Sequence, residues 1–184
     1  LPYNRPRLNR ERTRVVEGHA VMQPRIGIRH ETALRSRLAY LWSRETGVDP
    51  YAFAVSDPYQ DLFGHGIYVG KGILDLDLFV ELTAERIPEN RVLSHDLLEG
   101  GFLRTGLLSD ILLVDGMPGS FHAHQKRLHR WVRGDWQLLL WLLPKNRDRS
   151  GTRRKVDLPA IVRWQILDNL RRSLMAPALM LALL

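Results

Sequence analysis

The sequence predicts a mixed α/β fold. Two stretches rich in β-branched residues, Val15 to Ile28 and Ser109 to Val114, are typical of strands. Leucines at helical spacing predict an amphipathic helix from His30 to Glu45, and a longer helical pattern runs from Ser120 to Leu143. The chain has 184 residues, of which 45% are hydrophobic, so it can bury one core. Strands mixed with helices in this way favour a layered α/β arrangement.

The remaining elements follow from glycines and helix caps. Four glycines between Phe63 and Ile73 predict strand and turn structure in which the backbone approaches another group closely. A short helix is expected from Asp75 to Leu82. Ser94 is an expected N-cap for a helix through Phe102, which places Asp96 in the first turn of that helix.

The chain divides into three predicted parts. Residues 1–144 form the globular part, 145–157 a flexible basic loop, and 158–184 an amphipathic helix that leads into an apolar end. Residues 174–184 are continuously apolar and follow basic residues, the pattern of a cytoplasmic flank. A spanning helix needs about 20 such residues, so we expect a truncated transmembrane segment. Residues 1–7 have no initiator Met or signal peptide, which suggests a piece of a longer chain.

The composition limits the classes of function. Lys and Arg number 27 against 20 for Asp and Glu, a formal charge of +7, which favours an anionic partner. Nucleic acid, anionic lipid headgroups and a diphosphate all satisfy this condition. The sequence has no cysteine, which excludes disulfides, thiolate metal sites and a cysteine nucleophile.

Two motifs could carry chemistry. Residues 94–100 place Asp96 beside His95 at a helix start, where a carboxylate can serve as a general base or can simply complement the helix dipole. Residues 127–136 interleave arginines and tryptophans on one predicted helix. Guanidinium groups bind phosphate oxygens and indole rings stack on sugars or bases, whereas the same helix could also lie on lipid.

Two other candidate sites are weak. His122, His124 and His129 are close in sequence, but the first two point to different helix faces and no acidic ligand sits at a matching offset. The glycine-rich stretch lacks the full phosphate-loop pattern, so a nucleoside-triphosphatase is not indicated.

Taken together and in order, these stretches resemble the glycosyltransferase domain of bacterial cyclic β-1,2-glucan synthases. The likeness covers nearly the whole chain and lies in long contiguous runs. These runs are residues 55–64, 70–73, 88–90, 94–100, 129–137 and 168–173. That family is similar to processive inverting transferases such as cellulose and hyaluronan synthases.

The resemblance implies a fold and residue roles. It implies the C-terminal portion of a GT-A domain, followed by interface helices and the start of a transmembrane helix. Asp96 falls on the last residue of a Thr-Glu-Asp-like motif, the presumed general base, and His95 takes the place of its glutamate. Arg130 and Trp131 fall on the Arg-Trp of Gln-x-x-Arg-Trp. The remaining assignments are a diphosphate contact by Arg130 and Arg127, and acceptor contacts by Trp131, Trp136, Gly64, Gly66 and His95.

The sequence departs from the family pattern in two places. Arg127 replaces the glutamine of Gln-x-x-Arg-Trp, and no Asp-x-Asp motif precedes Val15, while Asp75-Leu76-Asp77 comes too late. We therefore expect no metal ligand in this chain and place the Mg²⁺ or Mn²⁺ site outside it. The isolated chain is then expected to be inactive.

The resemblance also implies partners. These are UDP-glucose, a glucan chain extended at its 2-hydroxyl, membrane lipids and the rest of a larger multidomain polypeptide. Nucleic acid is not an implied partner. The implied location is the bacterial inner membrane, with the catalytic part on the cytoplasmic side. The alternative is a basic Arg- and Trp-rich module that binds nucleic acid or a membrane interface without catalysis.

Overall fold

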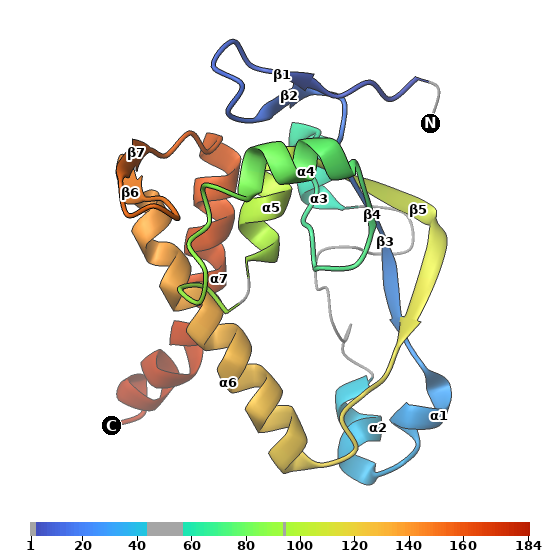
Figure 1. Cartoon of the computed structure of the whole chain (residues 1–184). Coiled ribbons are helices and arrows are strands. Elements are labelled where there is room, and N and C mark those ends of the chain that lie inside the picture. Colours follow the sequence, from blue (N-terminus) through green and yellow to red (C-terminus); the bar gives the residue numbers. More distant parts are fainter. Residues whose placement is uncertain (1–2, 44–56, 94) are drawn as a thin grey trace.

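The computed structural model describes residues 3–43, 57–93 and 95–184, which form the predicted mixture of helices and strands (Figure 1). Helices α5 and α6 both pack against α7, α4 packs against α5, and strands β4, β3 and β5 form the main sheet. The strands are β1 Arg7–Leu8, β2 Val15–Glu17, β3 Val21–Ile28, β4 Ile73–Leu74, β5 Thr105–Asp115, β6 Lys145–Arg147 and β7 Arg153–Lys155. The helices are α1 His30–Ala33, α2 Arg37–Ser43, α3 Pro58–Phe63, α4 Leu76–Thr83, α5 Asp96–Leu103, α6 Phe121–Gln137, the 3₁₀ helix η1 Leu138–Leu142 and α7 Ala160–Ala182.

Strand β3 is the centre of the main sheet. It pairs antiparallel with β4 and parallel with β5, from Val21 opposite Thr105 to Ile28 opposite Asp115. The register shifts after Pro24, because proline has no N–H to donate to the ladder. The sequence predicted a strand entering an extended segment at Val15 to Ile28. The structure instead has two strands, β2 and β3, with Gly18 at φ +66° between them.

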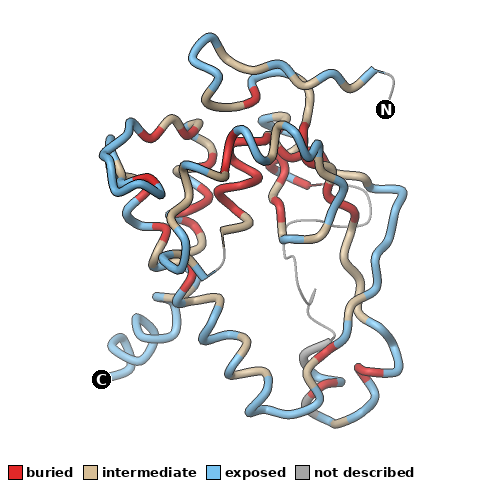
Figure 2. Tube along the Cα trace, in the orientation of Figure 1, coloured by how far each residue is buried: buried red, intermediate tan, exposed pale blue. Residues whose placement is uncertain are grey.

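Helix α5 is the centre of the core. All of its residues from Leu97 to Leu103 are buried, and Figure 2 shows the buried residues concentrated around α5, the first half of α7 and the start of β3. Two glycines permit this close packing, because a Cβ at Gly100 would lie 2.7 Å from Tyr68 Cβ and one at Gly101 would lie 2.7 Å from Val162 Cγ1. Phe102 packs edge-on against Trp141 with ring centroids 6.0 Å apart.

The middle of the chain differs from the prediction. The helix expected from His30 to Glu45 is divided into α1 and α2, and its expected end lies outside the described residues, as does the Ser94 cap. Helix α3 was not predicted. Asp57 caps it by accepting from the backbone N–H groups of Tyr59 and Gln60, and Gly64 ends it at φ +60°. Only Ile73–Leu74 of the glycine-rich region pairs as a strand.

The second half of the chain is closer to the prediction. Helix α4 begins beyond an Asp75 cap, and α6 with η1 covers the long helical pattern, with Ser120 as its cap. The expected loop at 145–157 contains the β6–β7 hairpin. Helix α7 continues through Pro177 to Ala182, and among the described residues no helix is long and apolar enough to cross a membrane. The predicted transmembrane start is therefore not confirmed.

Gly100→Ala should destabilise the protein by about 1–3 kcal/mol, because the added methyl would lie 2.6 Å from Thr105 Oγ1. This cost should exceed the helix-propensity gain of about 1 kcal/mol from replacing glycine with alanine. Urea unfolding measures the change. The control is Gly119→Ala, where a Cβ meets nothing within 4 Å. Equal stability of the two variants would contradict the packing described for α5.

Candidate active site

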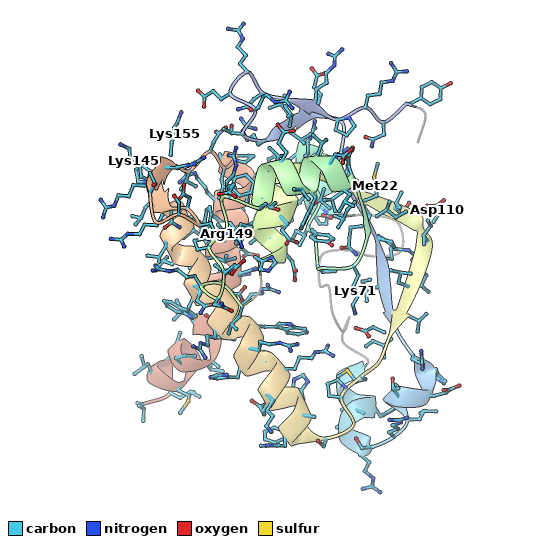
Figure 3. All side chains as sticks on the ribbon, viewed as in Figure 1. Met22, Lys71, Asp110, Lys145, Arg149 and Lys155 are labelled. Atoms are coloured by element: carbon cyan, nitrogen blue, oxygen red, sulfur yellow. The ribbon has the colours of Figure 1, made fainter. Side chains whose placement is uncertain are left out.

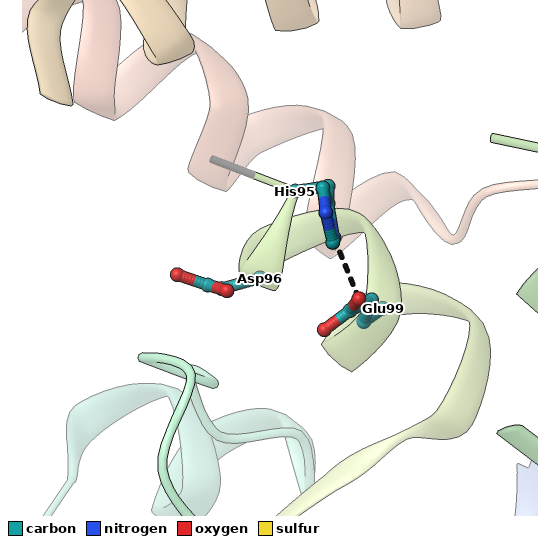
Figure 4. Close-up of side chains that lie close together, drawn as sticks. All are labelled: His95, Asp96 and Glu99. Atoms are coloured by element: carbon teal, nitrogen blue, oxygen red, sulfur yellow. Dashed lines mark hydrogen bonds and ion pairs between the residues drawn. The ribbon is translucent and has the colours of Figure 1, made fainter. Parts of the chain in front are cut away.

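The candidate site begins at the first turn of α5. Asp96 is the first residue of the helix, and His95 precedes it with its Nδ1 2.6 Å from Glu99 Oε1 (Figure 4). Glu99 is buried whereas His95 and Asp96 are partly exposed. The hydrogen bond to Glu99 raises the pKa of His95 against the opposing effect of burial. An anchored imidazole therefore adjoins the Asp96 carboxylate.

The backbone of the glycine-rich segment lies against Asp96. Gly70 has φ +80°, and a Cβ at this position would be 3.0 Å from Asp96 Oδ1. A side chain here would be strained and would also press on the carboxylate, so position 70 requires glycine. Tyr68 is buried on the same segment, and its pKa rises to about 12 because of burial and the charges of Glu99 and Asp96. Segment 68–70 thus forms one wall beside the carboxylate.

The next residue of this segment connects to the Arg- and Trp-rich helix. Lys71, which is labelled in Figure 3, forms an ion pair with Asp115 at the end of β5. The Lys71 ammonium lowers the pKa of Asp115, and the charge of Arg127 on α6 lowers it further. Arg127 in turn lies over the Trp131 ring, with its guanidinium carbon 4.5 Å from the ring centroid. Lys71 is therefore linked to Trp131 through Asp115 and Arg127, whose charges act on each other.

The other predicted residues of α6 have different surroundings. Arg130 is exposed, and Trp131 is partly exposed with one ring face covered by Arg127. Trp136 donates from Nε1 to Ser173 Oγ of α7 at 3.1 Å. That bond gives Trp136 a role in holding α6 against α7, while its ring remains exposed.

Gly64 and Gly66, predicted to contact the acceptor, pack against other parts of the chain, with Gly66 buried and Gly64 partly exposed. Gly64 ends α3 in the left-handed region, where a Cβ would meet the Arg104 guanidinium at 3.1 Å. Gly66 donates its N–H to Thr105 O at 2.9 Å, and a Cβ there would lie 3.1 Å from Asp57 Oδ2. The glycine that lies against Asp96 is Gly70.

His95, Asp96 and Glu99 also form the one group of such side chains, within the described ranges, that could surround a metal ion. Their ligand atoms lie within 4.8 Å of one another. The set contains an imidazole that is already hydrogen-bonded to Glu99, whereas Mg²⁺ prefers carboxylate, phosphate and water oxygens. The group therefore does not fit a magnesium site of the Asp-x-Asp type.

Several residues of this region were not singled out from the sequence. Lys71, Asp115 and Tyr68 were missed because ion pairs and packing between distant segments leave no local pattern. Glu99 had a detectable signal, since it follows His95 by four residues and therefore lies on the same helix face.

The comparisons with known proteins agree with the sequence motifs. No protein-family model matches the chain. The cyclic beta-(1,2)-glucan synthase NdvB of Rhizobium meliloti (strain 1021) is 42% identical to it over 179 residues, which is 96% of this chain. The chain spans 6% of the length of that relative. The predicted relationship to this synthase is thereby confirmed.

Glu99→Gln should lower the pKa of His95, because the hydrogen-bonded carboxylate that raises it is neutralised while the burial that lowers it remains. In the wild type, the stabilisation from this pair is fully present below the ordinary histidine pKa of 6.5 and is lost as the pH rises through the folded-state value. NMR titration of the imidazole signals measures the shift.

His65 is the internal control for this titration. Burial and nearby cationic groups lower the pKa of His65 to about 4, and Glu99 is not one of the groups that shift it. The titration of His65 should therefore be the same in both proteins. An unchanged His95 titration in the variant would contradict the role given to Glu99.

Proposed function

We propose that this chain, a relative of one segment of a glucan synthase, is the acceptor-side part of an inverting glucosyltransferase. In this proposal UDP-glucose is the donor and the 2-hydroxyl of a β-1,2-glucan is the acceptor. The observation that carries the proposal is the place of Asp96, which is the first residue of a buried helix and has the backbone of Gly70 against its carboxylate. A carboxylate held by its surroundings in this way suits a general base.

Asp96 removes the proton of the acceptor hydroxyl in this mechanism. As the O–H bond breaks, the oxygen attacks the anomeric carbon of glucose and the bond to UDP breaks on the opposite face. Gly70 fixes the carboxylate from one side, and because Asp96 is partly exposed its other side is open to the acceptor. His95, held by Glu99, is placed to contact the same sugar.

The cations of α6 stabilise the departing diphosphate. Arg130 is exposed, so its guanidinium can turn toward a phosphate. Arg127 is partly buried, lies over the Trp131 ring and is attracted by the charge of Asp115. These interactions hold its guanidinium in one orientation. We assign Arg130 as the direct phosphate ligand and Arg127 as its supporting charge, in the place where the family has glutamine.

Trp131 stacks on the sugar ring in this mechanism. One face of its ring is covered by Arg127, so a glucose ring stacks on the opposite face. Trp136, bonded to Ser173, contributes at most through the part of its ring that stays exposed.

The remaining parts of the proposal come from the relationship alone. They are a GT-A domain, Mg²⁺ or Mn²⁺ bound by residues outside this chain, and attachment to the cytoplasmic side of a bacterial inner membrane within a larger polypeptide. The cation would supply charge neutralisation at the leaving diphosphate. Basic side chains before the apolar end of α7, Arg171 and Arg172, suit this orientation.

Asp96→Asn should abolish glucan synthesis, with a loss of at least about a thousandfold, because the amide cannot accept the proton. Activity is measured in a chimera in which this chain replaces the matching segment of the Rhizobium meliloti synthase. Glucan formed from radiolabelled UDP-glucose is the readout. The control is Asp110→Asn, an exposed carboxylate on β5 that should leave synthesis unchanged.

Two results would refute this proposal. One is synthesis retained by the Asp96 variant. The other is an inactive parent chimera that is nevertheless folded and correctly inserted, since this chain would then not supply the activity of the segment it replaces.

Arg130→Ala in the same chimera should lower kcat/KM for UDP-glucose by about a hundredfold, because a charge-assisted bond to the diphosphate is lost. Arg133→Ala is the matched control, an exposed arginine three residues further along the same helix. Equal losses in the two variants would show a general effect of charge on α6 and would contradict the assignment of Arg130.

A further inference from the structure

The β6–β7 hairpin concentrates positive charge on one side of the molecule. Lys145 lies opposite Lys155 and Arg147 lies opposite Arg153 in the antiparallel register, so these four side chains share one face of the hairpin. Figure 3 shows Lys145 and Lys155 at this hairpin, far from β5. We call the four residues the cationic face.

Like charges placed directly opposite across strands destabilise a hairpin. The neighbouring cations of the hairpin are neutralised, since Arg149 pairs with Glu89 and Arg154 pairs with the buried carboxylate of Asp148. Within the described part of the chain, no side chain of the cationic face forms an ion pair or a hydrogen bond. The charge of Lys155 lowers the pKa of Asp157, but within the described residues neither like-charged cross-strand pair has an ion pair of its own, which favours an external anionic partner.

A cavity opens beside the cationic face. It has a volume of about 240 Å³ and is lined by Arg91, Arg147, Gln137 and Asn146 together with apolar groups that include Leu140. Two guanidiniums beside two amides suit a phosphate ester that carries a small polar group. The volume accommodates such a group but not an extended polymer.

Exposed leucines decide which kind of anion this surface fits. Leu139, Leu140 and Leu143 are 41%, 53% and 52% exposed, and they lie on η1 and at its end, directly before β6. Exposed leucines beside cations are typical of surfaces that enter a bilayer interface. Nucleic acid would instead favour exposed aromatic rings for base stacking, and the hairpin has none.

We propose that the cationic face, the adjoining cavity and the three leucines dock on an anionic phospholipid bilayer, with a headgroup phosphate between Arg91 and Arg147. The cations lie at headgroup level and the leucines enter the acyl boundary. This docking surface is independent of the glucosyl transfer proposed above, because its test measures binding alone.

The test is flotation of the 184-residue chain with phosphatidylcholine vesicles that contain or lack phosphatidylglycerol. The variant combines Lys145→Gln, Arg147→Gln, Arg153→Gln and Lys155→Gln. Each cation near an anionic membrane strengthens binding about fivefold, so removing four should cost the variant on the order of several hundredfold in affinity for phosphatidylglycerol vesicles. Its thermal stability should equal or exceed that of the wild type, because like-charge pairs are removed.

The matched control removes the same charge elsewhere, through Arg5→Gln, Arg10→Gln, Arg29→Gln and Arg35→Gln, all at exposed positions. This control should lose less than tenfold. Leu140→Ser should weaken vesicle binding about tenfold, whereas Leu62→Ser, an exposed leucine of α3, should not.

Comparison of the two vesicle types separates this surface from the apolar end of α7, which contributes equally to both. The proposal is overturned if phosphatidylglycerol adds nothing to wild-type binding, or if the control loses as much as the variant. It is also overturned if the variant loses RNA binding while its vesicle binding is unchanged.

Discussion

The arrangement of the candidate site depends on how residues 64–72 are fixed between α5 and the main sheet. The buried side chain of Gln23 accepts a hydrogen bond from Val69 N at 2.9 Å, and Gly66 N donates to Thr105 O at 2.9 Å. Tyr68 is buried against Gly100 between these two bonds. Because both strands and the helix hold this segment, Gly70 lies at Asp96 while Lys71 reaches Asp115. Asp96 and the Arg- and Trp-rich helix are connected through it.

Local sequence signals predicted the elements that depend on local physics. The helical pattern of α6, the short helix α4 and the strand β5 each depend on residues that are close together in sequence, and these elements form where expected. The hairpin at 145–155 was missed because the many charged residues of this stretch predicted a flexible loop. Its turn is stabilised by Asp148, which accepts from Thr152 N and Ser150 Oγ, and by the pairing of that carboxylate with Arg154.

The candidate site was predicted in its motifs but not in its contacts. The sequence indicated Asp96 and the Arg130–Trp131 pair, and their roles stay a prediction. It could not show which glycine lies at the carboxylate, because the approach of Gly70 depends on residues of β3 and β5 that are distant in sequence. It also could not show that Arg127 covers one face of Trp131, since the charge of Asp115 contributes to that position.

The central claim is that Asp96 and the Arg130–Trp131 pair line one space, with residues 70 and 71 between them. The chain has no cysteine, so Trp131→Cys provides a unique attachment point for a nitroxide spin label. Paramagnetic broadening of backbone amide NMR signals then reports which residues surround that position. The account predicts strong broadening at Gly70, Lys71 and Asp96, together with the signals of α6 itself. Broadening confined to α6 and α7, with Gly70 and Asp96 unaffected, would contradict it.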